Sequence, residues 1–104
     1  MNTQLYSFNE KCYQLLSRIP EGRVTTYKEI AQALKTKAYR AVGNAMANNK
    51  TPIVIPCHRV VKSNGEIGNY ALGVDKKIAL LKQEGVSVEN GRICDFSKRL
   101  YRFD

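Results

Sequence analysis

The sequence predicts a mainly α-helical domain with a small β component, arranged as a winged helix-turn-helix. Apolar residues recur at helical spacing behind two capping boxes, and the turn signal Asn64-Gly65 separates short extended segments. The 104 residues suffice for one small core, and no internal repeat or linker divides them. We therefore expect a single domain over residues 1–104, whose tail from about residue 92 to 104 either folds back as a basic amphipathic turn or frays.

The first predicted helix follows the capping box at residues 7–10, and Pro20 and Gly22 close it. Its core-facing residues share helical spacing: Phe8, Cys12, Leu15, Leu16 and Ile19. A last helix is predicted near the other end of the chain. Asp75 can cap it, Gly85 ends it, and it turns apolar residues to the core: Ile78 and Leu81.

Between these helices the sequence predicts a helix-turn-helix. A second capping box at residues 26–29 leads a short helix with Ile30, Ala31 and Leu34 on one face. A turn near Thr36 leads into a third helix, whose inward face is apolar: Ala38, Val42, Ala45 and Met46. Its other face carries small, polar and basic residues: Arg40, Asn44 and Asn48.

The β component is predicted after Pro52. Residues 53–55 form a short buried strand, and Val60-Val61 continues in extended form. The turn at Asn64-Gly65 then brings residues 66–67 back as a small wing, and a flexible loop follows at residues 68–73.

Charge indicates the class of partner. Lys and Arg number 17 against 9 acidic residues, a net charge of +8, which favours nucleic acid over an anionic membrane surface; a merely soluble basic surface is the alternative. No apolar run is long enough to cross a bilayer, and the first residues lack a signal-peptide pattern. The three cysteines are expected to be free thiols in a reducing cytosol, and their spacing gives no reason to expect a zinc site or another cofactor.

The segment Ile55-Pro56-Cys57-His58-Arg59-Val60 places the sole histidine directly after a cysteine, just beyond the predicted helix-turn-helix. Cysteine attacks carbon well once it is a thiolate. The alternative is a buried cysteine on a core strand. If the segment is extended, Cys57 and His58 point to opposite sides and need not touch.

Motifs running in order from about Phe8 to Gly85 resemble the C-terminal, active-site domain of the O6-alkylguanine-DNA alkyltransferases. The matching segments are Val24-Thr25-Thr26-Tyr27, residues 39–46, Asn49, Pro56-Cys57-His58-Arg59-Val60-Val61, Gly68-Asn69-Tyr70, Leu80-Leu81 and Glu84-Gly85. Three departures stand out. The family's usual N-terminal domain, with the zinc that some members carry there, is absent from this sequence. The loop after Tyr70 reads Ala71-Leu72-Gly73 where many members have smaller residues. A sister group of alkyltransferase-like proteins binds damaged DNA without repairing it and has tryptophan at the position of Cys57.

The resemblance implies a single-turnover methylated-DNA–protein-cysteine methyltransferase. It would flip O6-alkylguanine out of double-stranded DNA and transfer the alkyl group irreversibly to Cys57. We expect a monomer with no membrane partner, in the cytoplasm with the nucleoid or in the nucleus. One alternative is a non-catalytic lesion-binding protein that recruits repair factors. Another is a winged-helix regulator with an incidental cysteine.

The resemblance also assigns residue roles. A water would bridge Cys57 and His58, Glu84 would orient the imidazole, Asn49 would tie the active-site turn together, and Tyr27 would rotate the nucleotide and donate to the guanine. The DNA-binding residues would be Arg40, which fills the gap in the base stack, Tyr27, Asn44 and Ala41. The substrate pocket would be formed by Met46, Val60, Tyr70, Ala71 and Leu72, with the Val60 carbonyl reading the guanine amino group and Leu72 slowing reaction with a benzyl group.

Overall fold

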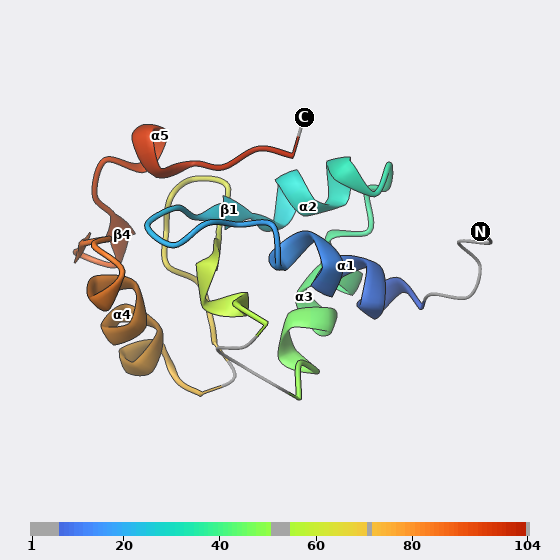
Figure 1. Ribbon diagram of the computed structural model, residues 1–104, viewed down its shortest axis with the longest axis horizontal. Coiled ribbons are helices and arrows are strands. Elements are labelled where there is room, and N and C mark those ends of the chain that lie inside the picture. The colour runs from blue at the N-terminus through green and yellow to red at the C-terminus, as the bar shows by residue number, and fades with distance from the viewer. Residues whose placement is uncertain (1–6, 51–54, 71, 104) are drawn as a thin grey trace.

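The computed structural model describes residues 7–50, 55–70 and 72–103 (Figure 1). The elements in chain order are α1 (Phe8–Leu16), β1 (Thr25–Thr26), α2 (Tyr27–Ala33), α3 (Tyr39–Ala47), the 3₁₀ turn η2 (Cys57–Arg59), β2 (Val60–Val61), α4 (Val74–Gln83), β3 (Val88–Glu89), β4 (Arg92–Ile93) and α5 (Phe96–Arg99). In Figure 1 the three helices α1 to α3 lie on one side of the β1–β2 pair, and α4 with the β3–β4 hairpin lies on the other. The predicted fold class, mainly helical with small sheets, is confirmed.

Helix α1 begins as predicted and ends earlier than predicted. The Ser7 hydroxyl accepts the Glu10 N–H at 3.1 Å, and Glu10 accepts the Ser7 N–H at 3.2 Å, so the capping box is complete. The helix ends at Leu16 because the Ser17 hydroxyl donates to the Tyr13 carbonyl at 3.1 Å, which favours a tightened last turn over continuation to Pro20. Ile19 nevertheless reaches the core beyond the helix end.

The helix-turn-helix is formed by α2 and α3. The Thr26 hydroxyl caps α2 by accepting the Glu29 N–H at 3.0 Å. In α3 the predicted inward residues Val42, Ala45 and Met46 are buried. The prediction for Ala38 is wrong: this residue is the N-cap, with non-helical backbone angles, and is exposed because it precedes the first residue of α3. The predicted outer residues are exposed: Arg40, Asn44 and Asn48.

The short strand β2 separates two parts of the core. It runs parallel to β1, with Thr25 opposite Val60 and Thr26 opposite Val61. Successive strand residues point to opposite faces, so Val60 joins the cluster of α1 to α3 while Val61 joins a second cluster around Leu81. Of the strand predicted at residues 53–55, only Ile55 lies within the described residues, and it is half-buried.

The turn predicted at Asn64-Gly65 is confirmed, with different strand pairing. The Lys62 N–H donates to the Glu66 carbonyl at 2.9 Å, and Gly65 has a φ of 89°. Glu66 then forms an antiparallel bridge with Arg92, so the returning segment pairs with the β3–β4 hairpin rather than along β2.

Helix α4 begins after Gly73, whose φ is 98°. The expected Asp75 cap is wrong, because Asp75 lies inside the first helical turn and its side chain makes no capping hydrogen bond. The helix ends at Gln83 with Glu84 as its C-cap, and Gly85, with a φ of 89°, follows as predicted. Leu81 is buried and Ile78 is half-buried. Within the described ranges, no helix is long and apolar enough to cross a membrane.

The tail over residues 92–103 folds back, one of the two expected alternatives. After α5, Leu100 forms a parallel bridge with Val24, next to β1. The Val24 N–H donates to the Arg99 carbonyl at 2.9 Å, and the Tyr101 N–H donates to the Val24 carbonyl at 2.7 Å. Figure 1 shows this segment running from α5 past β1 towards α2.

Candidate active site

Cys57 begins the 3₁₀ turn η2, and its side chain is only 3% exposed. The expectation of an extended segment here is wrong. Pro56, with φ −80° and ψ 64°, turns the chain, the Cys57 N–H donates to the Ile55 carbonyl at 2.8 Å, and the Arg59 N–H donates to the Pro56 carbonyl at 3.0 Å. The turn therefore fixes Cys57, His58 and Arg59 in one compact unit at the start of β2.

Cys57 lines a pocket of about 160 Å³. The other lining residues are Tyr27, Gly43, Met46, Ala47, Asn69 and Tyr70. Three of them belong to α3, so the thiol lies next to the second helix of the helix-turn-helix. Of the predicted pocket residues, Met46 and Tyr70 are in this lining. Val60 is not, because its side chain is fully buried in the core, and Leu72 is not, because it is 49% exposed. Ala71 lies outside the described residues.

Asn49 joins the end of α3 to the Cys57 turn. Its Nδ2 donates to the Ile55 carbonyl at 2.9 Å and to Cys57 Sγ at 3.3 Å. Donation to sulfur favours the thiolate over the thiol. Asn49 is buried, so this bond is shielded from competing water.

His58, Glu84 and Arg59 form a second cluster beside the thiol. His58 Nε2 lies 2.9 Å from Glu84 Oε2. Arg59 donates to both oxygens of the same carboxylate, at 2.9 and 2.7 Å, and to the Ile19 carbonyl at 2.8 Å. Burial alone would raise the pKa of Glu84, but the hydrogen bonds from Arg59 and His58 outweigh it and hold the pKa below its usual value.

The ionisation of this cluster sets the histidine tautomer. Burial lowers the pKa of His58, and the hydrogen bond that the ring donates to Glu84 only partly offsets it, so the ring is neutral at pH 7. A neutral ring beside an ionised carboxylate carries its proton on Nε2, which donates to Glu84 and leaves Nδ1 as an acceptor. In the described part of the chain Nδ1 is buried with no hydrogen-bond partner, as is the Tyr70 hydroxyl. The two rings meet edge-on, with centroids 6.3 Å apart.

Sequence reasoning missed Lys77. This α4 residue is fully buried, and its Nζ donates to the Val60 carbonyl at 2.7 Å and to the Asn69 carbonyl at 3.0 Å. Burial raises the pKa of Cys57, whereas Asn49, the Lys77 charge and a backbone hydrogen bond act to lower it. A signal was present, because Lys77 precedes Leu80 and Leu81 by three and four residues and so shares their buried helix face.

Three of the residues predicted to bind DNA lie on α3, and the fourth, Tyr27, lies on α2. Arg40 and Asn44 are exposed one turn apart, and Ala41 beside them is half-buried. Tyr27, predicted to act in both binding and chemistry, opens α2 and lines the Cys57 pocket. Burial raises the pKa of Tyr27, and the nearby Cys57 charge adds to this, so its hydroxyl remains a hydrogen-bond donor.

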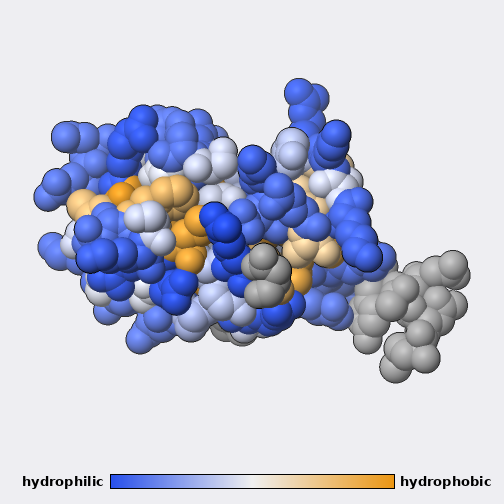
Figure 2. All heavy atoms as spheres, turned by 90° about the horizontal axis from the view of Figure 1, so that it is seen from above, coloured by the Kyte–Doolittle hydropathy of each residue, from blue (hydrophilic) through white to orange (hydrophobic). Residues whose placement is uncertain are grey.

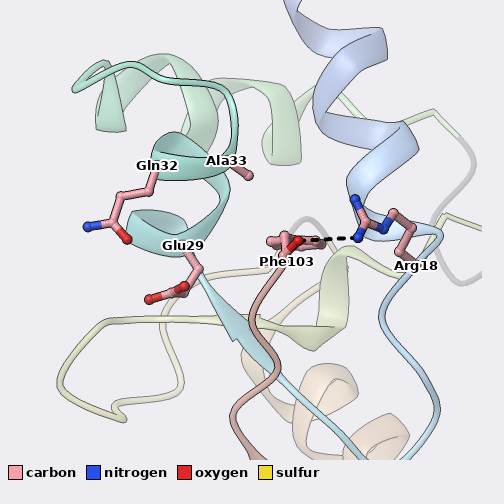
Figure 3. Close-up of a pocket in the computed structure, with 5 residues that line it drawn as sticks. All are labelled: Arg18, Glu29, Gln32, Ala33 and Phe103. Atoms are coloured by element: carbon pink, nitrogen blue, oxygen red, sulfur yellow. Dashed lines mark hydrogen bonds between the residues drawn. The ribbon is translucent and has the colours of Figure 1, made fainter.

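A different hollow, of about 310 Å³, lies where the tail meets α1 and α2 (Figure 3). Figure 3 shows the Arg18 guanidinium beside the Phe103 ring, with its hydrogen bond to the Phe103 carbonyl at 3.3 Å. The remaining lining residues are Glu29, Gln32 and Ala33, so this hollow has no thiol or histidine. Across residues 7–50, 55–70 and 72–103 no three His, Cys, Asp or Glu side chains gather as metal ligands.

The fold and the site together define a helix-turn-helix protein with a buried cysteine at the base of a pocket beside its second helix. The chain belongs to the 6-O-methylguanine DNA methyltransferase family, whose DNA-binding-domain model matches residues 7–86.

Three similar proteins extend this finding. A bifunctional methyltransferase/endonuclease from Picrophilus torridus is 45% identical over 101 residues, which are 96% of this chain and 32% of that protein. The O6-methylguanine-DNA methyltransferase of Pyrococcus kodakaraensis is 47% identical with a TM-score of 0.72, covering 79% of this chain and 48% of that one. Schizosaccharomyces pombe Atl1, solved with damaged DNA containing O6-carboxymethylguanine, is 28% identical with a TM-score of 0.80, covering 98% of this chain and 99% of that one. The chain thus spans a third to a half of the two methyltransferases and nearly all of Atl1.

Proposed function

We propose that this chain corresponds to the active-site domain of an alkyltransferase and repairs O6-alkylguanine in double-stranded DNA by transfer of the alkyl group to Cys57. The observation that carries the proposal is the placement of Cys57. Its thiol lies in a pocket beside α3 and accepts a hydrogen bond from Asn49. The neighbouring histidine is neutral and is hydrogen-bonded to Glu84. A cysteine kept only for packing would need neither a pocket nor these polar neighbours.

DNA binding is assigned to α3 and the charge of the chain. Arg40 and Asn44 face outward from α3, and the net charge of +8 favours a phosphate backbone. The face in Figure 2 is mostly hydrophilic, with hydrophobic residues gathered in small areas. Cys57 is buried in a pocket lined by α3, so a guanine in the base stack is out of reach of its thiol and must be flipped out. Arg40 would take its place in the stack, and Tyr27 would help to rotate it.

The chemistry follows from the tautomer of His58. The Cys57 thiol loses its proton through a water to His58 Nδ1, and Glu84 stabilises the ring as it becomes charged. The thiolate attacks the alkyl carbon, the carbon–sulfur bond forms, and the bond to O6 breaks with its electron pair moving to the guanine. A donor such as the Tyr27 hydroxyl passes one proton to the base and is reprotonated through solvent by the proton that His58 took from the thiol, so the products are guanine and an S-alkylcysteine. No step regenerates the thiol, so each chain acts once.

The likeness to Atl1 favours a second candidate, a protein that binds alkylated guanine without repairing it. Atl1 matches this chain over nearly its whole length and was solved with O6-carboxymethylguanine DNA. The cysteine at position 57 distinguishes the two functions, because the alkyltransferase-like proteins that the sequence resembles have tryptophan there.

A stoichiometric repair assay separates them. The purified chain is incubated with duplex DNA carrying O6-methylguanine, and the remaining lesion is quantified after digestion to nucleosides. Repair predicts loss of one lesion per chain, and no loss with Cys57→Ser. Retention of every lesion together with tight, lesion-selective binding would instead support the binding protein.

A further inference from the structure

Lys77 is the largest fully buried side chain in the described part of the molecule. Burying an ammonium group is costly unless charge or hydrogen bonds compensate for it. The ion pairs found among the described residues belong to Glu84, with His58 and Arg59, and the Lys77 ammonium donates to two carbonyls instead. Two neutral acceptors compensate only partly, and burial accordingly lowers the pKa of Lys77 to about 8.

The two acceptors belong to two different segments at the Cys57 site. Val60 is the C-cap of η2, and its N–H donates to the Cys57 carbonyl. Asn69 lines the pocket beside Tyr70. Lys77 therefore ties the end of the turn that carries the thiol to the loop that contributes Asn69 and Tyr70 to the pocket lining.

Gly68 places the ammonium group near Tyr27. A Cβ atom on Gly68 would lie 3.7 Å from Lys77 Nζ and 3.5 Å from the Tyr27 hydroxyl. Gly68 also has a φ of 73°, which a side chain rarely adopts. The lysine thus lies just behind the pocket, separated from a pocket-lining tyrosine by a residue without a side chain.

The positive charge of Lys77 and the negative charge of a Cys57 thiolate stabilise each other. The ammonium charge acts to lower the pKa of Cys57 against the effect of burial, and a thiolate at Cys57 acts to raise the pKa of Lys77. The other titratable groups near Cys57 are neutral at pH 7: Tyr13 on α1, Tyr27 on α2, Tyr70 in the loop and His58. Lys77 is the cation among the groups that act on Cys57.

We propose that Lys77 is a positioning residue whose ammonium ion holds the Val60 carbonyl at the end of the Cys57 turn and the Asn69 carbonyl at the pocket, and stabilises the Cys57 thiolate. Its consequence for alkyl transfer rests on the proposed function. The thiolate itself is measured with iodoacetamide, which needs neither DNA nor alkylguanine, so failure of one proposal is distinguishable from failure of the other.

The experiment follows carbamidomethylation of Cys57 by peptide mass mapping over a range of pH. Lys77→Met removes the charge at similar length, and Lys76→Met, an exposed lysine on the same helix, is the matched control. We expect Cys57 in Lys77→Met to react roughly tenfold more slowly at neutral pH, with its profile moved to higher pH, while Lys76→Met matches the wild type. Lys77→Arg, which keeps the charge, should restore much of the profile. Identical profiles for Lys77→Met and wild type would overturn the proposal.

If Lys77→Met does not fold, a measurement on the wild-type protein tests whether Lys77 and Cys57 interact. The titration of Lys77 is followed by nuclear magnetic resonance with isotope-labelled lysine, before and after Cys57 is capped with iodoacetamide. Capping removes the thiolate, so the ammonium group should lose its proton at lower pH than in the uncapped protein. An unchanged titration would show that the two groups do not interact and would refute the inference.

Discussion

At the scale of single residues, the site depends on which groups are charged. Glu84 is held ionised by Arg59 and His58, and His58 is held neutral by burial. Burial opposes the Cys57 thiolate, whereas Asn49 and Lys77 favour it. Because burial keeps most of Cys57 in the thiol form, little thiolate exists without a proton acceptor. A neutral base beside the thiol therefore has its largest effect on the reaction rate in this state.

The role of His58 as the proton acceptor gives a pH-dependent prediction. His58→Asn removes Nδ1 as a base, so transfer from methylated DNA should be about tenfold slower at neutral pH. The deficit should shrink as pH rises through the pKa of Cys57, because the thiolate then forms without a base. Single-turnover rates across pH measure this, with DNA affinity as the control. A deficit of the same size at every pH would contradict the assignment.

At the scale of secondary-structure elements, α3 combines two functions. Its exposed face carries Arg40 and Asn44, and Gly43 and Ala47, which adjoin them on the helix surface, line the pocket together with the buried Met46. One short helix is therefore expected to contact DNA and to form the wall against which the flipped base lies.

Arg40→Ala should weaken binding to lesion-bearing duplex by on the order of 1–3 kcal/mol, the scale of a lost stacking contact. It should slow repair of duplex DNA but hardly affect reaction with free O6-methylguanine, because a free base needs no flipping. Binding titrations and transfer rates on both substrates test this. The exposed Lys82→Ala on α4 is the control. Equal loss of activity on duplex and free base would rule out the proposed role of Arg40.

The loop between Tyr70 and α4 carries the prediction about substrate size. Leu72 is exposed outside the pocket lining, two residues after Tyr70, so it can obstruct only a group that projects from the pocket mouth. O6-benzylguanine should react more slowly than O6-methylguanine in DNA, and Leu72→Gly should narrow the gap, since such overpacking typically costs about 1–3 kcal/mol. Relative rates for both substrates measure it. Equal benzyl sensitivity of wild type and Leu72→Gly would assign the limit to Met46 and Tyr70 instead.

The elements also show how far sequence reasoning extends. Local sequence patterns predicted the features that depend only on nearby backbone groups. These are the capping residues Ser7 and Thr26 and the glycine after α4. The turn at Cys57 depends on Pro56 and on the distant Asn49, so an apolar run suggested a strand instead. Lys77 was missed because its burial is compensated by the carbonyls of Val60 and Asn69, which belong to the segments before α4 and are not part of the helical pattern. Cys57 beside His58 was a candidate nucleophile from the residues alone, but the pairing of His58 with Glu84 was predicted only through a family resemblance, since no spacing rule joins residues 58 and 84.

At the scale of the whole molecule, the C-terminal tail packs against the segment between α1 and β1. The Arg23 side chain donates to the Arg99 carbonyl at 3.1 Å and to the Leu100 carbonyl at 2.6 Å, and Arg18 lies over the Phe103 ring. Tyr101 and Phe103 pack against the core cluster of α1 to α3. The family match ends at residue 86, so this strand-like addition beside β1 lies beyond the matched region.

Removing the hydrogen bonds of Arg23 should lower the stability of the fold without changing the reactivity of Cys57. Arg23→Ala should lower the free energy of unfolding by about 1–3 kcal/mol, because the Leu100 carbonyl loses the Arg23 donor and the Arg99 carbonyl keeps only the Val24 N–H. Urea unfolding gives the stability, and iodoacetamide reactivity of Cys57 reports on the site. Exposed Arg102→Ala is the control. Wild-type stability in Arg23→Ala would mean that the tail contributes little.

The central claim is that Cys57 alone accepts the alkyl group. Cys12 is buried in α1 with its pKa raised to about 11 by burial, and Cys94 lies outside the pocket lining, so both serve as internal controls. The decisive measurement is peptide mass mapping after incubation with duplex DNA containing O6-methylguanine. We predict the mass of one added methylene group on the peptide containing Cys57, in proportion to the lesion consumed, and none with Cys57→Ser. A methyl group on Cys12 or Cys94, or no modified cysteine despite lesion binding, would contradict the account.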